Sequence, residues 1–270
     1  MKILLNNIDL NKALYGSTNI GFVPTMGGLH EGHISLVRKS LKQCKKTIVS
    51  IFVNPTQFNN KNDFKKYPRN LQKDLNILKK LKVNFVYVPE KRDVYYSKSN
   101  VKIKLKLKEK ILCAKFRKGH FEGVINVMTS LTKLINPSKI FMGEKDFQQL
   151  YLVKKYINKR FKSKIIACKT IRDKTKLALS TRNILLNKND KIKAGNIAKS
   201  LISFKLQLLK SNSLKKLIYK KKNILKKVYK IKIEYLELRN TKNLIISNKV
   251  KNSRLFFAYY INKVRLIDNF

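Results

Sequence analysis

The sequence predicts an α/β protein with a Rossmann-like parallel sheet, followed by a smaller α+β domain. In roughly the first 174 residues, apolar runs typical of buried parallel strands alternate with helical patterns. A glycine-rich turn with two histidines follows one of these runs, at residues 24–33. Beyond residue 174 the chain becomes more basic and helical before it ends in strand patterns. We therefore expect two domains, 1–174 and 175–270.

Length and composition favour a globular protein of the cytoplasm. The chain has 270 residues, of which 43% are hydrophobic, enough for one large or two modest cores. It has no run of eighteen apolar residues, so we expect no membrane span and no membrane partner. The apolar segment at the N-terminus is too short for a signal peptide. Three scattered cysteines, Cys44, Cys113 and Cys168, fit a reducing compartment.

The net charge is the least ordinary feature of the composition. The chain carries 62 Lys and Arg against 15 Asp and Glu, a formal charge of +47, which would suit a polyanionic partner. The lysines are nevertheless spread along the whole chain, and Asn and Ile, which share A/T-rich codons with Lys, are also abundant. We interpret the charge as codon bias at tolerant surface positions and expect no specific nucleic-acid partner. A nucleic-acid-binding module remains the alternative from a different class.

The first half of the chain repeats the order strand, helix, strand. Such units cross over with a right hand and place ligand sites at the carboxyl ends of their strands. We expect a short strand and a weak helix within residues 1–16, strands at 20–23, 47–53 and 83–89, and helices at 34–45 and 70–81.

The second half predicts further strands and two basic helices. Val101, Ile103, Leu105 and Leu107 alternate with Lys, which indicates a half-exposed strand or hairpin arm. We expect a helix at 127–135, strands at 139–142 and 163–171, helical structure over 184–230, and strands at 233–238, 254–261 and 264–269. The helical part has a candidate core stripe of Leu201, Leu208, Leu209, Leu217 and Leu225.

The glycine-rich turn suits phosphate binding. Gly27, Gly28 and Gly32 let the backbone approach a polyphosphate, and the helix N-terminus that follows offers free N–H groups. His30 and His33 can donate to phosphate oxygens as charge develops. A His-x-x-His pair can also bind a metal. Gly32 between the histidines argues against a ligand-bearing helix, and no Cys or third His follows at metal-ligand spacing.

Three other segments carry groups suited to an anionic substrate. Gln57 follows a predicted strand at the same rim as the histidines and has a donor and an acceptor in one side chain. Lys145 follows another strand, although a solvated lysine is a serious rival in so basic a chain. Hydroxyls and a guanidinium in residues 180–182 can surround a triphosphate.

These segments together resemble the pantoate–β-alanine ligase (pantothenate synthetase) family of the nucleotidyltransferase superfamily, whose His-x-Gly-His turn binds ATP. The resemblance spans nearly the whole chain and implies ATP-dependent condensation of (R)-pantoate with β-alanine through a pantoyl-adenylate. It further implies Mg²⁺ with ATP, a homodimer, and a C-terminal domain that closes over the nucleotide. The matching blocks are residues 23–33, 53–58 with Asp63, 67–69 and Asp74, then 116–124, 143–149, 177–183 and 264–269.

The resemblance also implies roles for individual residues of this chain. The catalytic residues would be His33, as a proton donor, with His30 and Lys145. Pantoate and β-alanine would be bound by Gln57, Gln149, Asn54 and Tyr67. ATP would be bound by Met26, Gly27, Gly28, Leu29, His30, Glu31, Gly32, His33, Gly143, Glu144, Lys145, Asp146, Leu179, Ser180, Thr181 and Arg182.

The chain departs from the family pattern at two places. Thr181 stands where the family usually has Ser, which keeps the hydroxyl. Thr175-Lys176 stands where the family usually has Asp-Gly, and loss of that glycine puts the mobility of the following loop and the turnover rate in question. A nucleotidyltransferase acting on another small acid and an inactive, decaying enzyme remain alternatives.

Overall fold

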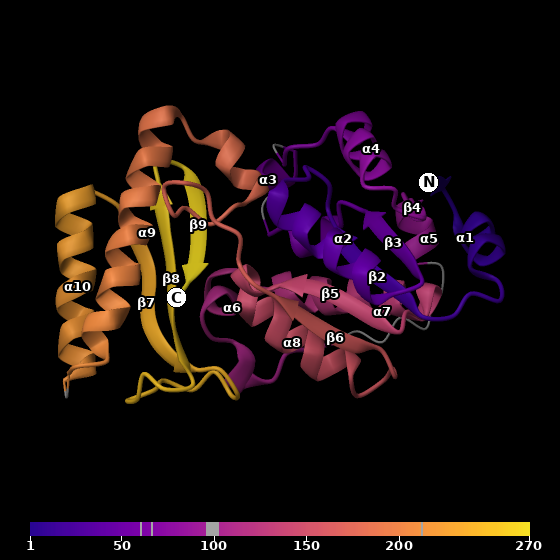
Figure 1. Ribbon diagram of the computed structural model, residues 1–270. Coiled ribbons are helices and arrows are strands. Elements are labelled where there is room, and N and C mark those ends of the chain that lie inside the picture. The colour runs from indigo at the N-terminus through magenta and orange to yellow at the C-terminus, as the bar shows by residue number, and fades with distance from the viewer. Residues whose placement is uncertain (60, 66, 96–102, 212) are drawn as a thin grey trace. The chain divides into compact units, whose positions relative to one another are not determined.

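The computed structural model describes residues 1–59, 61–65, 67–95, 103–211 and 213–270 (Figure 1). The chain divides into two compact units, Met1–Lys169 and Thr170–Phe270. The domain boundary near residue 174 stays a prediction. No helix among the described residues has the length and apolar character to cross a membrane.

The first unit is built on a parallel sheet, as predicted. Its described strands run in the spatial order β1-β4-β3-β2-β5-β6, and each neighbouring pair is parallel. The strands are β1 (Lys2–Leu4), β2 (Ile20–Thr25), β3 (Lys46–Ile51), β4 (Phe85–Tyr87), β5 (Lys139–Gly143) and β6 (Lys164–Cys168).

Helices accompany this sheet. Leu36 and Val37 of α2 and Leu78 of α4 pack into one apolar cluster with Val23, Val49, Val86 and Phe141 from the strands. Burial of such side chains is the main force that holds the layers together. The helices are α1 (Asn7–Leu14), α2 (Glu31–Gln43), α3 (Lys61–Lys65), α4 (Leu71–Lys80), α5 (Lys91–Val94), α6 (Cys113–Phe116), α7 (His120–Ile135) and α8 (Phe147–Ile157), with 3₁₀ turns η1 (Pro55–Gln57), η2 (Leu107–Glu109) and η3 (Glu144–Asp146).

The strand predicted at 101–107 is wrong where it can be tested. Ile103 and Leu105 are buried, as their alternation implies, but Leu107 is 86% exposed and begins η2. The backbone N–H of Ile103 donates to Asn126 Oδ1 rather than to another strand. Alternation placed the apolar side chains inside without supplying a strand partner. Val101 lies outside the described residues.

The second unit has two long helices on a three-stranded antiparallel sheet of order β7-β8-β9, which confirms the predicted smaller α+β domain (Figure 1). Leu201, Leu208 and Leu225 are buried in its core, as predicted, and Leu217 packs against it. Leu209 is 62% exposed because it is the C-cap of α9 and lies past the end of the apolar stripe. The elements are η4 (Thr181–Leu185), α9 (Lys188–Leu208), α10 (Leu214–Tyr229), β7 (Lys232–Asn240), β8 (Ser253–Ile261) and β9 (Val264–Asn269).

Candidate active site

The candidate site lies where the order of the sheet reverses. β2 and β5 are neighbours in the sheet, yet β3 lies on the far side of β2 and β6 on the far side of β5. The crevice outside the carboxyl ends of two such strands is the usual ligand site of an open α/β sheet. The glycine turn leaves β2 after Thr25, and Glu144, Lys145 and Asp146 follow β5.

The glycine turn is held from outside by a buried carboxylate. Asp74 of α4, only 2% exposed, accepts hydrogen bonds from the backbone N–H of Gly28 and of Leu29, each at 2.8 Å. Gly27 and Gly28 have φ values of 76° and 63°, in the left-handed region that favours glycine. The N–H of Gly27 donates to Thr25 Oγ1 at 3.2 Å. Three hydrogen bonds along the turn thus fix its path.

The two histidines cap the helix that follows the turn. The predicted helix start at Ile34 is three residues late, because His30 is the N-cap of α2 and His33 occupies its third position. His30 Nδ1 accepts from the N–H of Gly32 at 3.1 Å, and His33 Nδ1 accepts from the N–H of His30 at 3.4 Å. This is a capping box in which imidazole nitrogens take the place of the usual side-chain oxygens. The ring centroids lie 4.1 Å apart.

These hydrogen bonds define the tautomer of both rings. A backbone N–H can only donate, so each Nδ1 must present its lone pair. In the neutral ring the proton is then on Nε2, so Nε2–H is the donor of each ring. The site therefore offers two imidazole N–H donors, set by the backbone of the turn itself.

Local electrostatics keep both rings neutral. Burial, followed by the nearby Lys145 cation, lowers the pKa of His30 from 6.5 to about 4, against an opposing effect of Asp146. Burial also lowers the pKa of His33 to about 3, with His30 as the next cause. The side chain of Lys145 is 17% exposed and forms an ion pair of 3.3 Å with Asp146.

The prediction of free helix N–H groups for phosphate is wrong for most of this turn. The N–H groups of Gly27, Gly28, Leu29, His30 and Gly32 all donate to side chains of the protein. The glycines therefore allow a tight, internally bonded turn. The groups of this site suited to an anion are the imidazole N–H groups and the ammonium group of Lys145.

Gln57 is in η1, directly after β3. Its side-chain amide contacts Met26 Sδ in the glycine turn, so the structure brings these two predicted site residues together. Asn54 Nδ2 donates to Gln57 Oε1 at 3.3 Å and to the carbonyl of Gly123 at 3.1 Å. Asn54 is 1% exposed, so its side chain serves this internal network. The ring of Tyr67 is buried, edge-on to Phe58.

The two glutamines of α8 have different environments. Gln148 is buried; it donates to the carbonyl of Ile111 at 2.7 Å and accepts from the N–H of Cys113 at 3.0 Å. Gln149, the predicted pantoate ligand, is half-buried on the same helix. Glu31 is exposed and forms an ion pair with Arg38 of its own helix, α2.

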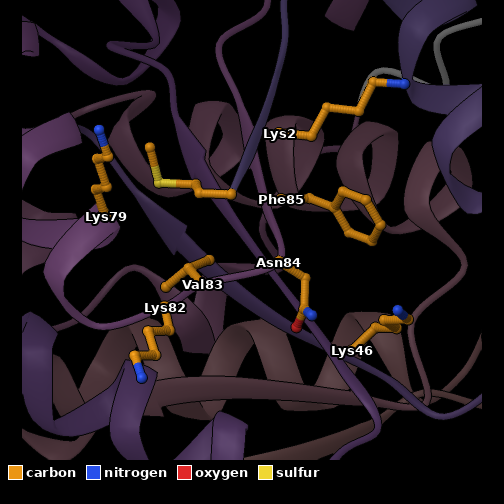
Figure 2. A pocket seen from close by; sticks show the side chains of 8 residues that line it. Lys2, Lys46, Lys79, Lys82, Val83, Asn84 and Phe85 are labelled. Carbon is orange, nitrogen blue, oxygen red and sulfur yellow. The ribbon is translucent and has the colours of Figure 1, made fainter.

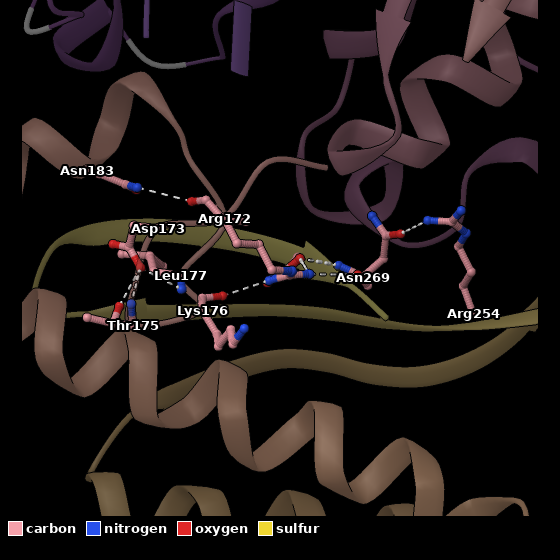
Figure 3. A network of polar contacts seen from close by, with 10 residues as sticks. Arg172, Asp173, Thr175, Lys176, Leu177, Asn183, Arg254 and Asn269 are labelled. Carbon is pink, nitrogen blue, oxygen red and sulfur yellow. Dashed lines mark hydrogen bonds and ion pairs between the residues drawn. The ribbon is translucent and has the colours of Figure 1, made fainter. Parts of the chain in front are cut away.

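The predicted residues Leu179–Arg182 belong to the second unit. Ser180 is the N-cap of η4 and accepts from the N–H of Arg182 at 3.4 Å, while Thr181 is buried. The turn that precedes them is drawn in Figure 3. There Asp173 accepts from the N–H groups of Thr175 and Leu177, and Arg172 donates to the carbonyl of Lys176 at 3.0 Å.

Arg172 also ties this turn to the end of the chain. Its guanidinium makes a bidentate pair with Asp268, at 2.6 and 2.8 Å. Such fork-like pairs fix geometry as well as charge. The residue ahead of Leu177, Lys176, has φ of 74°, the conformation that a glycine would favour.

A lysine-lined hollow of about 450 Å³ is present elsewhere in the first unit (Figure 2). Lys2, Lys46 and Phe85 on its wall are the first residues of β1, β3 and β4. It therefore lies at the amino ends of the strands, the opposite edge from the histidines. Figure 2 shows the ammonium groups of Lys2, Lys79 and Lys82 pointing in different directions, so the hollow does not compete for the role of active site.

Sequence reasoning missed the part played by Asp74. The residue lies in the segment that resembles the family, but nothing in its spacing shows that it reaches the glycine turn 46 residues earlier. An acidic residue at a helical core position, in line with Leu71, Leu75 and Leu78, is the available signal.

Comparisons with known proteins agree with this geometry. The sequence model of the family described as "Pantoate-beta-alanine ligase" matches residues 5–270. A pantothenate synthetase of Clostridium botulinum is 42% identical over 259 residues, which cover 93% of this chain and 91% of that protein. A pantothenate synthetase of Flavobacterium psychrophilum is 38% identical over 271 residues, 96% of this chain and 94% of that protein.

Solved structures give the same result. The crystal structure of pantothenate synthetase from Thermus thermophilus has a TM-score of 0.93 at 29% identity and covers 100% of this chain and 99% of that one. The pantoate-beta-alanine ligase from Francisella tularensis, complexed with "Beta-gamma ATP" and β-alanine, has a TM-score of 0.84 at 37% identity. It covers 100% of this chain and 97% of that one.

Proposed function

The chain belongs to the pantoate-beta-alanine ligase family, and on that premise we propose how its own residues perform the reaction. The chain is an ATP-dependent ligase that joins (R)-pantoate to β-alanine and releases AMP and pyrophosphate. The observation that carries the proposal is the pair of Nε2–H imidazoles, His30 and His33, beside Lys145 at the switch point of the sheet.

In the first step a carboxylate oxygen of pantoate attacks the α-phosphorus of ATP. The new bond forms as the bond to the pyrophosphate oxygen breaks, and negative charge grows on the phosphates. His30 and His33 donate hydrogen bonds to these oxygens, and Lys145 supplies positive charge. Because such donors are already oriented, they stabilise the transition state without reorganising. We propose Ser180, Thr181 and Arg182 for the departing pyrophosphate on their motif alone.

In the second step the β-alanine amine attacks the activated acyl carbon, and AMP departs. Gln57 and Gln149 hold the acid substrates in this proposal, and orientation accounts for much of the acceleration. Mg²⁺ arrives with ATP as part of the substrate and keeps its preference for phosphate oxygens and water. In this proposal His33 acts by donating a hydrogen bond from Nε2–H, in keeping with the burial that lowers the pKa of its ring to about 3.

ATP–pyrophosphate exchange tests the function. With Mg²⁺ at moderate salt, exchange should require pantoate, and added β-alanine should then yield pantothenate and AMP. No exchange from the folded, ATP-binding chain would refute an active adenylating enzyme, and exchange supported equally well by another small acid would reassign the substrate.

A pair of variants at His33 tests the proposed donor. His33→Ala removes both the cap and the donor, and should slow single-turnover adenylation by about 10²–10³-fold. His33→Gln can accept from the N–H of His30 through its oxygen and still donate through its nitrogen, so it should recover part of the rate. An unchanged rate in His33→Ala would exclude the role.

We further propose that the enzyme acts in the cytoplasm as a homodimer. The three cysteines are free thiols, which fits a reducing compartment. Light scattering on the purified chain would measure its mass, and a monomer would contradict the homodimer.

A further inference from the structure

The backbone carbonyl of Gln57 is contacted by two side chains of the segment 116–124. His120 Nδ1 lies 2.6 Å from this oxygen, and Arg117 Nη2 donates to it at 3.4 Å. His120 is 7% exposed, and it is the first residue of α7. These contacts connect a motif with no assigned role to the residue proposed to bind the acid substrates.

Arg117 also defines the tautomer of His120. Its Nη1 lies 2.8 Å from His120 Nε2, and a guanidinium can only donate. Nε2 of the imidazole is therefore the acceptor, and Nδ1 carries the proton that is donated to Gln57. The order of donation is Arg117 to His120 to the Gln57 carbonyl. A partner that orients an imidazole in this way fixes both its ring plane and its proton.

Asn54 and Gly123 restrict the same loop further. A Cβ on Gly123 would lie 2.4 Å from the carbonyl oxygen of Thr56 and 2.9 Å from the nitrogen of Gln57, so α7 approaches η1 more closely than a side chain would permit. Asn54 Nδ2 bridges the carbonyl of Gly123 and the side chain of Gln57. The close approach of α7 and the hydrogen bonds of Asn54 thus leave the peptide of Gln57 little freedom.

We propose that Arg117 and His120 are positioning residues that hold Gln57 in the conformation that binds pantoate and β-alanine. The inference rests on the proposed role of Gln57. It predicts a selective defect, because His30, His33 and Lys145 serve ATP through separate contacts. Removing the Nδ1–H donor weakens the use of the acid substrates and leaves the use of ATP almost unchanged.

The test compares KM for pantoate, β-alanine and ATP in the full-length enzyme. His120→Leu should raise KM for pantoate by about 10–100-fold, the effect of one lost buried hydrogen bond, with KM for ATP within about twofold. His120→Asn keeps an N–H donor near the position of Nδ1 and should restore most of the affinity. Arg117→Met should give a smaller shift in the same direction and serves if His120→Leu does not fold.

Two controls separate positioning from simple loss of stability. Ser163→Ala removes another buried side-chain donor to a backbone carbonyl, that of Pro137 at 2.6 Å, just before β6. It should lower the melting temperature without any selective change in KM. In a Gln57→Ala background His120→Leu should add little, because residues that act through one another are not additive.

Parallel increases in all three KM values, or a full additional loss in the Gln57→Ala background, would overturn the inference. So would His120→Asn behaving like His120→Leu. Failure of the proposed function would be visible separately, as absence of pantoate-dependent exchange in the unsubstituted enzyme.

Discussion

Two turns of this molecule are stabilised in the same way, but they differ in the side chains that they can accept. The glycine turn after β2 and the turn at residues 173–177 each pass through the left-handed region, and in each an aspartate accepts two backbone N–H groups. In the first, Asp74 reaches in from α4. In the second, Asp173 belongs to the turn itself, as in an Asx turn.

The turns differ in the space beside the left-handed residue. A Cβ on Gly27 would lie 3.0 Å from Asp74 Oδ2 and 3.3 Å from Ile51 Cγ2, so the carboxylate that holds the turn also excludes a side chain. Lys176 has nearly the same φ but is exposed. In the second turn the crowded residue is Thr175, which packs closely against Gly195 of α9. A Cβ on Gly195 would lie 2.4 Å from the Thr175 hydroxyl oxygen.

This difference means that the exposed turn can accept a lysine at its left-handed position, whereas the enclosed turn requires glycine. Left-handed backbone alone costs an ordinary residue about 1–2 kcal/mol, which a fold can absorb. Left-handed backbone inside an enclosed site adds a steric cost to that. We therefore expect the left-handed backbone of the exposed Lys176 to cause only a modest loss of stability.

The largest effect is expected for Gly27→Ala. The new methyl meets Asp74 Oδ2 and adds left-handed strain, so we expect a loss of about 2–4 kcal/mol in unfolding free energy. Displacement of the turn would also misplace both imidazoles, and a shift of about 1 Å can cost about 100-fold in rate. Urea denaturation and ATP–pyrophosphate exchange measure the two effects.

Gly16→Ala is the matched control for that experiment. Gly16 has φ of 65° with nothing within 4 Å of its would-be Cβ, so the substitution isolates backbone strain. It should cost about 1 kcal/mol and leave exchange unchanged. Equal losses of stability in the two variants would show that the enclosure by Asp74 has no energetic weight.

The next largest effect is expected from acid. Lowering the pH should destabilise the glycine turn more than the turn at residues 173–177, because only the glycine turn is followed by imidazoles that titrate. Unfolded histidines have a pKa near 6.5, whereas burial lowers the pKa of His30 to about 4 and that of His33 to about 3. The unfolded chain therefore binds more protons as pH falls below 6.5, and stability falls with it. At pH 5 the two rings should together lower the free energy of unfolding by about 2–4 kcal/mol relative to pH 7.

A double variant, His30→Asn with His33→Gln, provides the reference. Asn is a good N-cap and Gln suits the third position, so the capping box can persist without a titrating group. The variant should lose less stability than the unsubstituted chain between pH 7 and pH 5 in denaturant unfolding. Equal losses would place the histidine pKa values near those of free imidazole.

Replacing each aspartate by Asn should produce a smaller and unequal effect. Asp74→Asn leaves one acceptor and points an NH₂ group at a backbone N–H, which should cost about 1–3 kcal/mol and slow adenylation. Asp173→Asn keeps one oxygen for the local turn and should cost about 0.5–1 kcal/mol, with little change in adenylation. Melting temperature and ATP–pyrophosphate exchange, measured on both variants, would show whether the carboxylate of Asp74 contributes more to stability and activity than that of Asp173.

The features that could be predicted from the sequence depend on contacts between neighbouring residues, whereas those that could not depend on contacts between residues far apart in the chain. The alternation of strands and helices, the glycine turn and its histidines were readable because their signals lie within a few residues. The N-cap role of His30 was missed because a histidine is not among the usual caps, so the start of α2 was placed at Ile34. Asp74 contacts a residue 46 positions away in the sequence, and His120 contacts one 63 positions away. A single sequence does not show which distant residues touch, so these contacts could not be predicted.

Lys176→Gly should produce the smallest effect, and in the stabilising direction. Glycine removes the left-handed strain of about 1–2 kcal/mol but brings back about 0.5–1 kcal/mol of unfolded-state entropy, so the net gain should be about 0.5 kcal/mol. The hydrogen bond from Arg172 goes to the backbone carbonyl of residue 176 and survives the change. Lys174→Gly, at an exposed position of the same turn without positive φ, should instead destabilise by about 0.5–1 kcal/mol. Opposite signs in urea unfolding would establish that the backbone of residue 176 is strained in the native enzyme, whereas equal destabilisation would show that the turn has relaxed around its lysine.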